Sequence, residues 1–158
     1  MQQQHYAFIK EAIDMASLNV ANSGGGPFGA LVVKDGKVVG RGVNRVTTTN
    51  DPTAHAEVTA IRDACKNLST YQLKNAVIYT SCEPCPMCLS AIYWARIKTI
   101  YYAAESKDAA EAGFDDSFFY QQILLPANKR TIISERIAVD NYNKPFSTWL
   151  ESEIKKEY

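Results

Sequence analysis

The sequence lacks any excess of charge, because its 17 lysines and arginines are matched by 17 aspartates and glutamates. Without net basic charge there is no overall field to attract nucleic acid. The sequence also lacks an apolar run near the roughly 20 residues that span a bilayer, and its first residues, MQQQHY, lack the apolar core of a signal peptide. No internal repeat or low-complexity linker interrupts the 158 residues, a length typical of one domain. We therefore expect a soluble, cytoplasmic, single-domain protein.

Cysteine is scarce as well, but three of the four cysteines lie within SCEPCPMC, residues 81–88. In a reducing compartment, clustered cysteines indicate metal ligands or catalytic groups before disulfides. Cys82 and Cys85 form one C-x-x-C motif, and Cys85 and Cys88 form another. Three cysteines with a histidine would close a structural zinc site, whereas two cysteines with a histidine leave zinc an open, catalytic position.

Hydrophobic periodicity predicts alternating strands and helices over the first two thirds of the chain. Helices are expected over residues 4–21, about 54–67 and from Cys85 to about Trp94. Strands are expected over residues 28–34, 37–46, 75–81 and 98–105. A hairpin turn joins the first two strands, at Asp35-Gly36, whereas the strand–helix–strand order favours parallel pairing of the last two. We therefore predict an α/β fold of three layers, with a mixed central sheet and helices on both faces.

The pattern is weaker in the last third of the chain. Residues 106–124 predict two short helices around Gly113, and residues 131–139, TIISERIAV, fit either a final strand or an extended arm. Near the end, apolar side chains step by four residues and predict an amphipathic helix over 145–158. These side chains are Phe146, Leu150, Ile154 and Tyr158.

Cys85 and Cys88 are three positions apart at the start of a predicted helix, so both side chains lie on one side of it. Pro86 suits the first helical position and places Cys85 at the cap. The partial positive charge of a helix N-terminus favours the thiolate that a metal requires. Cys82 lies before this helix, at the end of the preceding strand, because Pro84 keeps Glu83 in an extended conformation. We expect Cys85 and Cys88 to bind the metal and Cys82 to be structural.

His55 and Glu57, in the stretch TAHAE, begin the second predicted helix. Residues two apart do not present both side chains to one ion on a regular helix, as residues four apart would. The spacing suits one metal ligand, His55, and one free carboxylate, Glu57. With Cys85 and Cys88 the histidine makes three ligands, which leaves the fourth position of one Zn²⁺ per chain open. Glu57 can then move protons beside the metal.

HAE and PCPMC together resemble the H-x-E…P-C-x-x-C signature of zinc-dependent nucleobase deaminases. More blocks, spread over nearly the whole chain, are similar to the bacterial guanine deaminases of the cytidine/deoxycytidylate deaminase fold family. These blocks are GGPFGALVV, NDPTAHAEVTAIR, YTSCEPCPMCLSAIYWAR, AAEAGFDDSF and KKEY. The resemblance implies a cytidine-deaminase-like fold and the hydrolytic conversion of guanine to xanthine and ammonia, a step of purine catabolism or salvage. Glu57 is then expected to carry protons from the water to the leaving amine.

Guanine presents two hydrogen-bond donors, N1–H and its 2-amino group, for which a carboxylate is the natural acceptor. The stretch GFDDSF offers Asp115 and Asp116, and on the residues alone a helix cap is an equally good interpretation. The resemblance assigns this edge of the base to Asp116. It also places Asn44 on the polar edge of the purine and Phe28 against the ring. The alternatives for these two are a turn residue and a core residue.

The guanine deaminases that the chain resembles form dimers in which the C-terminal segment covers the active site of the partner. The resemblance therefore implies a homodimer of one domain spanning 1–158, with about residues 140–158 exchanged between protomers. Tyr158 would close the neighbouring zinc pocket, since an aromatic ring with a polar tip suits a lid that excludes water. The alternative is a terminal helix that packs on its own domain.

Two other functions fit parts of the sequence. A tRNA adenosine deaminase, or another nucleobase or nucleoside deaminase of the same fold, would share HAE and P-C-x-x-C, but an RNA substrate needs an electropositive surface. A zinc-stabilised interaction module without activity would have no use for a carboxylate such as Glu57. We expect a small purine base as the ligand, with neither nucleic acid nor a membrane as partner. His5 and Cys65 are expected to be structural.

Overall fold

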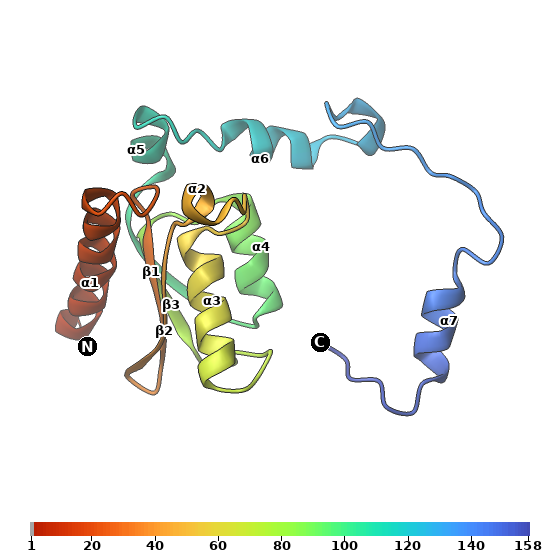
Figure 1. Ribbon diagram of the computed structural model, residues 1–158, viewed down its shortest axis with the longest axis horizontal. Coiled ribbons are helices and arrows are strands. Elements are labelled where there is room, and N and C mark those ends of the chain that lie inside the picture. Colours follow the sequence, from red (N-terminus) through yellow and green to blue (C-terminus); the bar gives the residue numbers. More distant parts are fainter. Residues whose placement is uncertain (1) are drawn as a thin grey trace. The chain divides into compact units, whose positions relative to one another are not determined.

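The computed structural model describes residues 2–158 and is drawn in Figure 1. The chain divides into two compact units, which join between Ser117 and Phe118. The first unit holds the sheet and the helices that flank it, and the second holds short helices connected by irregular chain. Among the described residues, no helix combines the length and the apolar character needed to span a membrane.

Four strands form one mixed sheet in the order β2-β1-β3-β4. In chain order they are β1 (Gly29–Lys34), β2 (Lys37–Val43), β3 (Val77–Cys82) and β4 (Thr99–Ala104). β1 pairs antiparallel with both β2 and β3, and β3 pairs parallel with β4. The hairpin turn is confirmed, and Asp35 and Gly36 both have positive φ, as a type I′ turn requires. The predicted mixed sheet is therefore confirmed.

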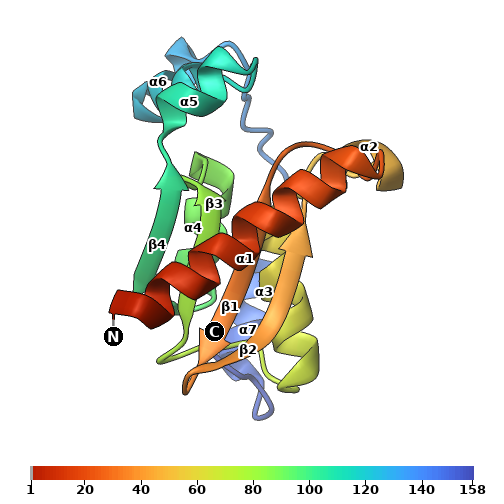
Figure 2. The ribbon, with the colours of Figure 1, turned by 90° about the vertical axis from the view of Figure 1, so that its left-hand side faces the viewer.

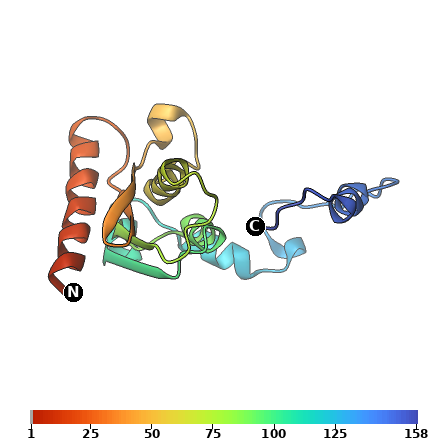
Figure 3. The ribbon, with the colours of Figure 1, turned by 90° about the horizontal axis from the view of Figure 1, so that it is seen from below.

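Helices cover both faces of this sheet (Figures 2 and 3). The long helix α1 (Gln2–Ala21) lies on one face, and α3 (Ala56–Asn67) and α4 (Pro86–Trp94) lie on the other. β1 serves both layers, because successive side chains of a strand point to opposite faces. Leu31 and Val33 pack with α1, whereas Ala30 and Val32 belong to the core beneath α3 and α4. The predicted three-layer α/β fold is confirmed.

Glycines in β2 bring α3 unusually close to the sheet. A Cβ atom on Gly42 would lie 2.1 Å from the carbonyl oxygen of Ala56, and one on Gly40 would lie 2.4 Å from that of Ala60. On the helix side the contact is made by alanines four residues apart, so neither surface carries a large side chain. This packing fixes how close the first turn of α3 lies to the sheet.

Three short helices complete the first unit or lead out of it. They are α2 (Val46–Thr49), α5 (Ser106–Glu111) and α6 (Ser117–Leu124), of which α6 continues into the second unit. The last two confirm the prediction of two helices around Gly113, which takes the left-handed conformation with φ of 91°.

The second unit differs from the prediction at its end. It contains the 3₁₀ turn η1 (Ala127–Lys129) and the helix α7 (Lys144–Glu151), and residues 131–139 contribute no strand. The helix predicted over 145–158 is wrong in its length, because α7 ends at Glu151 and Ser152 is extended. Short helices are marginal without packing, and chain ends fray. Ile154 and Tyr158 thus lie beyond the helix.

Candidate metal centre and active site

His55 lies at the first turn of α3, where the chain changes from extended to helical. Its own backbone is extended, with φ of −70° and ψ of 159°, and it caps the helix without a side-chain hydrogen bond. The imidazole is therefore not used to cap the helix and is available as a ligand. Because α3 is held close to β2 by the glycine contacts, the sheet fixes the position of the His55 backbone, from which the imidazole extends.

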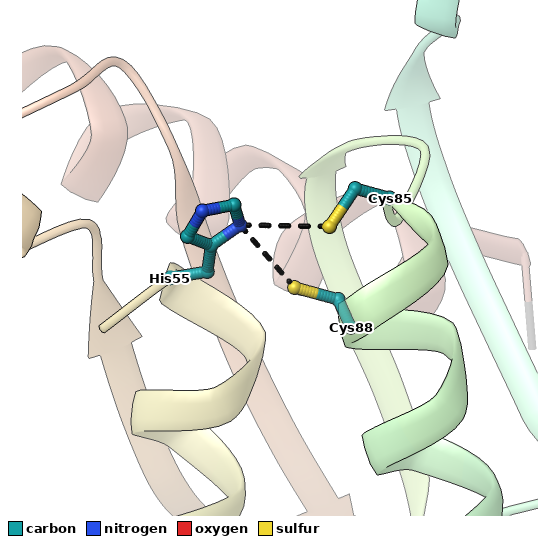
Figure 4. A group of neighbouring side chains, drawn as sticks. All are labelled: His55, Cys85 and Cys88. Carbon is teal, nitrogen blue, oxygen red and sulfur yellow. Dashed lines mark hydrogen bonds between the residues drawn. The ribbon is translucent and has the colours of Figure 1, made fainter. Parts of the chain in front are cut away.

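Cys85 and Cys88 occupy the corresponding place on α4. Cys85 is the extended cap residue, with φ of −64° and ψ of 167°, and Pro86 follows it at the start of the helix. Cys88 is fully buried one turn further on. The cap geometry expected from the P-C-x-x-C spacing is present, so both sulfur atoms lie on the side of α4 that faces His55 (Figure 4).

The three side chains have the spacing of zinc ligands. The His55 Nδ1 atom is 3.6 Å from the Cys85 Sγ atom and 3.5 Å from the Cys88 Sγ atom (Figure 4). Ligating atoms of all three residues lie within 4.8 Å of one another. Tetrahedral zinc, with its usual bond lengths to nitrogen and sulfur, separates two such ligands by about 3.6 Å. The donor set and its geometry therefore fit one zinc ion, with three protein ligands.

The surroundings of Cys85 favour its thiolate form. The Cys88 thiol donates a hydrogen bond to Cys85, which lowers the pKa of Cys85 to about 4. The same hydrogen bond raises the pKa of Cys88. The pKa of His55 is raised, first because of its hydrogen bond with Cys85. A coordinated metal ion would deprotonate both thiols, because the cation is the largest charge in such a site.

Glu57 adds a buried carboxyl beside these ligands. It lies in the first turn of α3 and is only 7% exposed. The pKa of its carboxyl is raised to about 7, chiefly by burial and also by Cys85, against the lowering effects of its hydrogen bonds and of His55. A carboxyl with a pKa near neutrality, next to a metal site and outside the ligand group, has the properties of a general base.

Cys82 lies apart from the ligand group. It is the last residue of β3, it is buried, and its Sγ atom donates to the carbonyl oxygen of Glu105 at 3.6 Å. Burial raises the pKa of its thiol to about 11, so the thiol stays protonated at neutral pH. Its position at the strand end, one residue before Glu83, is the one expected from the sequence.

Asp115 and Asp116, which the sequence could not separate, have different surroundings. The Asp115 carboxylate accepts a hydrogen bond of 2.8 Å from the backbone N–H of Ser117 at the start of α6, and this contact lowers its pKa. Asp116 is partly buried. Its pKa is raised, mainly by this burial and to a smaller extent by the nearby Cys85. Asp116 in turn raises the pKa of His55. Asp115 therefore caps the helix, and Asp116 is within electrostatic reach of the metal ligands.

Asn44 follows directly after β2 and is 7% exposed. Its Oδ1 atom accepts hydrogen bonds from the backbone N–H groups of Gly26, at 3.2 Å, and Val46, at 3.3 Å. These bonds orient the amide, because the oxygen faces two donors. The Nδ2 group is then a hydrogen-bond donor for a further partner. Asn44 is thus both a turn residue and a polar group with a fixed orientation.

Phe28 is partly buried against the core beneath α3 and packs edge-to-face on Phe114, with 5.0 Å between the ring centroids. The sequence alone indicated no role for Phe114. Its position two residues before Asp116, in a loop that turns at Gly113, is the signal that could have identified it. The contact joins the loop of Asp116 to Phe28.

His5, Cys65 and Tyr158 are the other residues singled out in the sequence. The His5 Nδ1 atom is 2.7 Å from the Tyr79 hydroxyl, and the ring packs on Tyr79 and Tyr101, so His5 contributes to packing. Cys65 packs against the core on α3, as expected. Tyr158 is exposed at the end of the second unit, and its expected contact with a partner remains a prediction.

Comparison with known proteins matches residues 2–104 to the cytidine and deoxycytidylate deaminase zinc-binding region. The guanine deaminase of Bacillus subtilis is 57% identical over 154 residues, which cover 98% of this chain and 99% of the relative. The X-ray structure of guanine deaminase from Bacillus subtilis superposes with a TM-score of 0.95 over 98% of each chain.

More distant relatives match less of the chain. A guanine deaminase structure from Nitrosomonas europaea is 32% identical and superposes with a TM-score of 0.67, over 70% of this chain and 64% of that one. A tRNA-specific adenosine deaminase of Agrobacterium fabrum is 43% identical over 60% of this chain and 62% of its own length. The region matched to the family, residues 2–104, contains all three residues of the His-Cys-Cys centre. The chain is a member of the zinc-binding cytidine and deoxycytidylate deaminase family.

Proposed function

We propose that the protein is a guanine deaminase, which hydrolyses guanine to xanthine and ammonia in purine catabolism or salvage. The observation that carries this proposal is the near-full-length identity of 57% to the guanine deaminase of Bacillus subtilis. The site supports it, because a buried carboxyl lies beside three zinc ligands and outside their group.

Glu57 is the proposed proton carrier of the reaction. Bound zinc supplies the Lewis acidity that makes water a nucleophile near neutral pH. Glu57 accepts a proton from the attacking water, and it returns protons to the ring nitrogen and then to the departing amine. Its burial supports this role, because a carboxyl whose pKa is near 7 can both take and release a proton at neutral pH.

Asp116, Asn44 and Phe28 are the proposed contacts to the base. An aspartate offers only acceptors, which match the N1–H and 2-amino donors of guanine. The Asn44 amide, held by its oxygen, offers a donor to the acceptors on the polar edge of the purine. Phe28 offers an aromatic ring to the face of the base. Acceptor and donor together select guanine over adenine, which lacks donors at the corresponding positions.

The alternatives have less support. The tRNA-specific adenosine deaminase relative matches 60% of this chain, against 98% for the guanine deaminase, and equal numbers of basic and acidic residues give no bulk attraction for RNA. A zinc-stabilised module without activity does not account for Glu57, since such a module has no use for a buried carboxyl outside the ligand group. All four cysteines are free, which fits the reducing cytoplasm that we propose as its compartment.

The test of substrate is ammonia release over a panel of guanine, guanosine, adenine, cytosine and cytidine. Guanine should be the preferred substrate. Asp116→Asn should lower kcat/KM for guanine by about ten- to a hundredfold, because it replaces a charged acceptor. Asp115→Asn is the matched control, with the same chemical change one residue away, and should retain nearly full turnover. Undiminished turnover by Asp116→Asn would reject the proposed recognition.

We also propose that the active protein is a homodimer of single-domain chains that exchange their C-terminal segments, about residues 140–158. Large apolar side chains of the second unit are exposed in one chain, including Leu124 at 85% and Ile154 at 89%. Such surfaces are typical of protein interfaces. Exchange would cover them and would bring Tyr158 over the zinc site of the neighbour.

A mixing experiment tests the exchange. The full-length Glu57→Ala chain and a wild-type chain without its last few residues should each form poorly active homodimers. After unfolding and refolding together, a mixed dimer has one complete site, with Glu57 from the truncated chain and the tail from the mutant. Activity should return in part. Mixed dimers that form and stay inactive would rule out the exchange.

A further inference from the structure

A buried asparagine at the end of α1, Asn19, is hydrogen-bonded to Asn44, one of the proposed contacts to the base. Asn19 lies in the last turn of α1 and is 8% exposed, although asparagine is mostly an exposed residue. It neighbours no metal ligand in sequence, and the reaction proposed above does not use it. A buried polar side chain of this kind needs hydrogen-bond partners within the protein.

Both amide hydrogens of Asn19 are used, and each holds a different segment. Its Nδ2 group donates to the carbonyl oxygen of Gly26 at 2.9 Å and to the carbonyl oxygen of Asn44 at 2.8 Å. The backbone N–H of Gly24 donates to the Asn19 carbonyl oxygen at 2.7 Å. One side chain therefore joins α1, the glycine loop 24–26 and the residue after β2.

These hydrogen bonds belong to a closed network of Asn19, Gly26 and Asn44. The backbone N–H of Gly26 donates to Asn44 Oδ1, so the segment that Asn19 holds is the one that orients the Asn44 amide. Asn44 also donates its backbone N–H to the carbonyl oxygen of Phe28, at 3.1 Å. Both proposed contacts to the base, Asn44 and Phe28, thus belong to the network that Asn19 anchors.

The loop has little space in which to take another path. A Cβ atom on Gly24 would lie 2.3 Å from Asn19 Oδ1, and one on Gly25 would lie 2.3 Å from the Asn44 carbonyl oxygen. Gly25 also has φ of 142°, a conformation that other residues rarely adopt. The three glycines therefore let the backbone approach Asn19 and Asn44 closely enough for these hydrogen bonds.

We propose that Asn19 is a positioning residue for base recognition, which fixes the Asn44 amide with its donor free for the purine. The proposal rests on the function proposed above and on the role of Asn44 in it. Asn19 itself touches neither base nor metal. Its loss should therefore weaken the binding of guanine and leave the zinc centre and the proton transfer intact.

Asn19→Asp tests this with almost no change in shape. It puts a carboxylate oxygen against two carbonyl oxygens that now accept hydrogen bonds, so the loop must move. The KM for guanine should rise about tenfold or more, the cost of the lost hydrogen bonds, with kcat within about threefold of wild type and zinc content unchanged. Asn22→Asp makes the same charge change at an exposed position just after α1 and should behave as wild type.

Asn19→Ser removes both amide donors without adding charge, and it serves if Asn19→Asp does not fold. A purely structural role would lower Tm and the active fraction, and therefore kcat, with KM unchanged. A KM that stays within about twofold of wild type in a folded Asn19 variant would overturn the proposal.

A double-mutant cycle separates positioning from independent effects. If Asn19 acts through Asn44, then Asn19→Ser should raise KM little further in an Asn44→Ala background. Fully additive effects would overturn the proposal. Failure of the wild type to deaminate guanine would instead reject the proposed function. Hydrogen exchange then still decides the positioning role, because the Gly26 and Val46 amides should lose protection in Asn19→Ser and keep it in Asn22→Asp.

Discussion

Residues 2–117 and residues 118–158 differ in where their apolar side chains lie. In the first region, the two faces of one sheet are covered, and the core includes Leu31, Ile78 and Ile92. In the second region, no residue of α6 or α7 is buried within the described chain. A segment of this size rarely buries enough apolar surface to fold alone. The first region can therefore hold catalytic groups at fixed distances, whereas the second presents its large apolar side chains to solvent.

The difference also separates two kinds of functional residue. The candidate zinc ligands and Glu57 lie at the starts of helices that are packed on the sheet, so their spacing is set by the core. Tyr158 lies in a segment without a core of its own, so its proposed role depends on assembly with a second chain.

Removing a zinc ligand should have the largest effect. Cys85→Ala should lose the metal and all measurable activity, because zinc needs its three protein ligands. Metal analysis and ammonia release measure both. Cys82→Ala is the matched control and should keep about one zinc per chain and most of its activity. A Cys82→Ala protein without zinc would show that Cys82 is a ligand and that the site is closed.

Removing the proton carrier should leave the metal in place. Glu57→Gln should retain zinc and lower kcat by about 10²–10⁴, the usual contribution of general acid–base catalysis. Its zinc content and its circular dichroism should match those of the wild type. Loss of metal from this variant would mean that Glu57 is a ligand and not a base.

The burial of Glu57 should make the stability of the metal-free protein depend on pH. Its pKa is raised from 4.5 to about 7 on folding, so the folded state binds the proton more tightly. This contribution to stability is fully present below 4.5 and is lost as the pH rises through about 7. Wild type should therefore lose about 3 kcal/mol relative to Glu57→Gln across this range.

Urea unfolding of the two metal-free proteins at about pH 4 and about pH 8 measures this loss. The thiols are present in both proteins, so the comparison isolates the titration of Glu57 together with its coupling to them. A difference between wild type and Glu57→Gln that does not change with pH would contradict the effect of burial.

Substitution of an exposed apolar side chain in the second region should act on the proposed assembly. Leu124→Asp should weaken formation of the proposed dimer by roughly ten- to a hundredfold, because a leucine that becomes buried in an interface contributes about 1.5–3 kcal/mol. Gln121→Asp, an exposed polar position on the same helix, is the control and should stay dimeric. Light scattering over a range of protein concentrations measures both. Unchanged association of Leu124→Asp would show that this side chain faces solvent in the assembly.

The sequence was sufficient for the elements whose signals are local. Asp35-Gly36 predicted the hairpin because only a few residue types accept positive φ, and Pro86 predicted the start of α4 because its fixed φ suits a first helical position. The short spacing of Cys85 and Cys88 predicted that both face one side of α4. The end of α7 was misjudged, because periodicity does not show whether a helix has a surface to pack on.

The tertiary structure decided what depends on distance between segments far apart in the chain. His55 and Cys88 meet because Gly40 and Gly42 let α3 lie close against the sheet beside α4. Asp115 and Asp116 are identical in chemistry and adjacent in sequence, and only their burial and their neighbours separate a helix cap from a group near the metal ligands. No sequence motif marks Asn19, because its proposed role depends on two carbonyl oxygens that come close to it only in the folded chain.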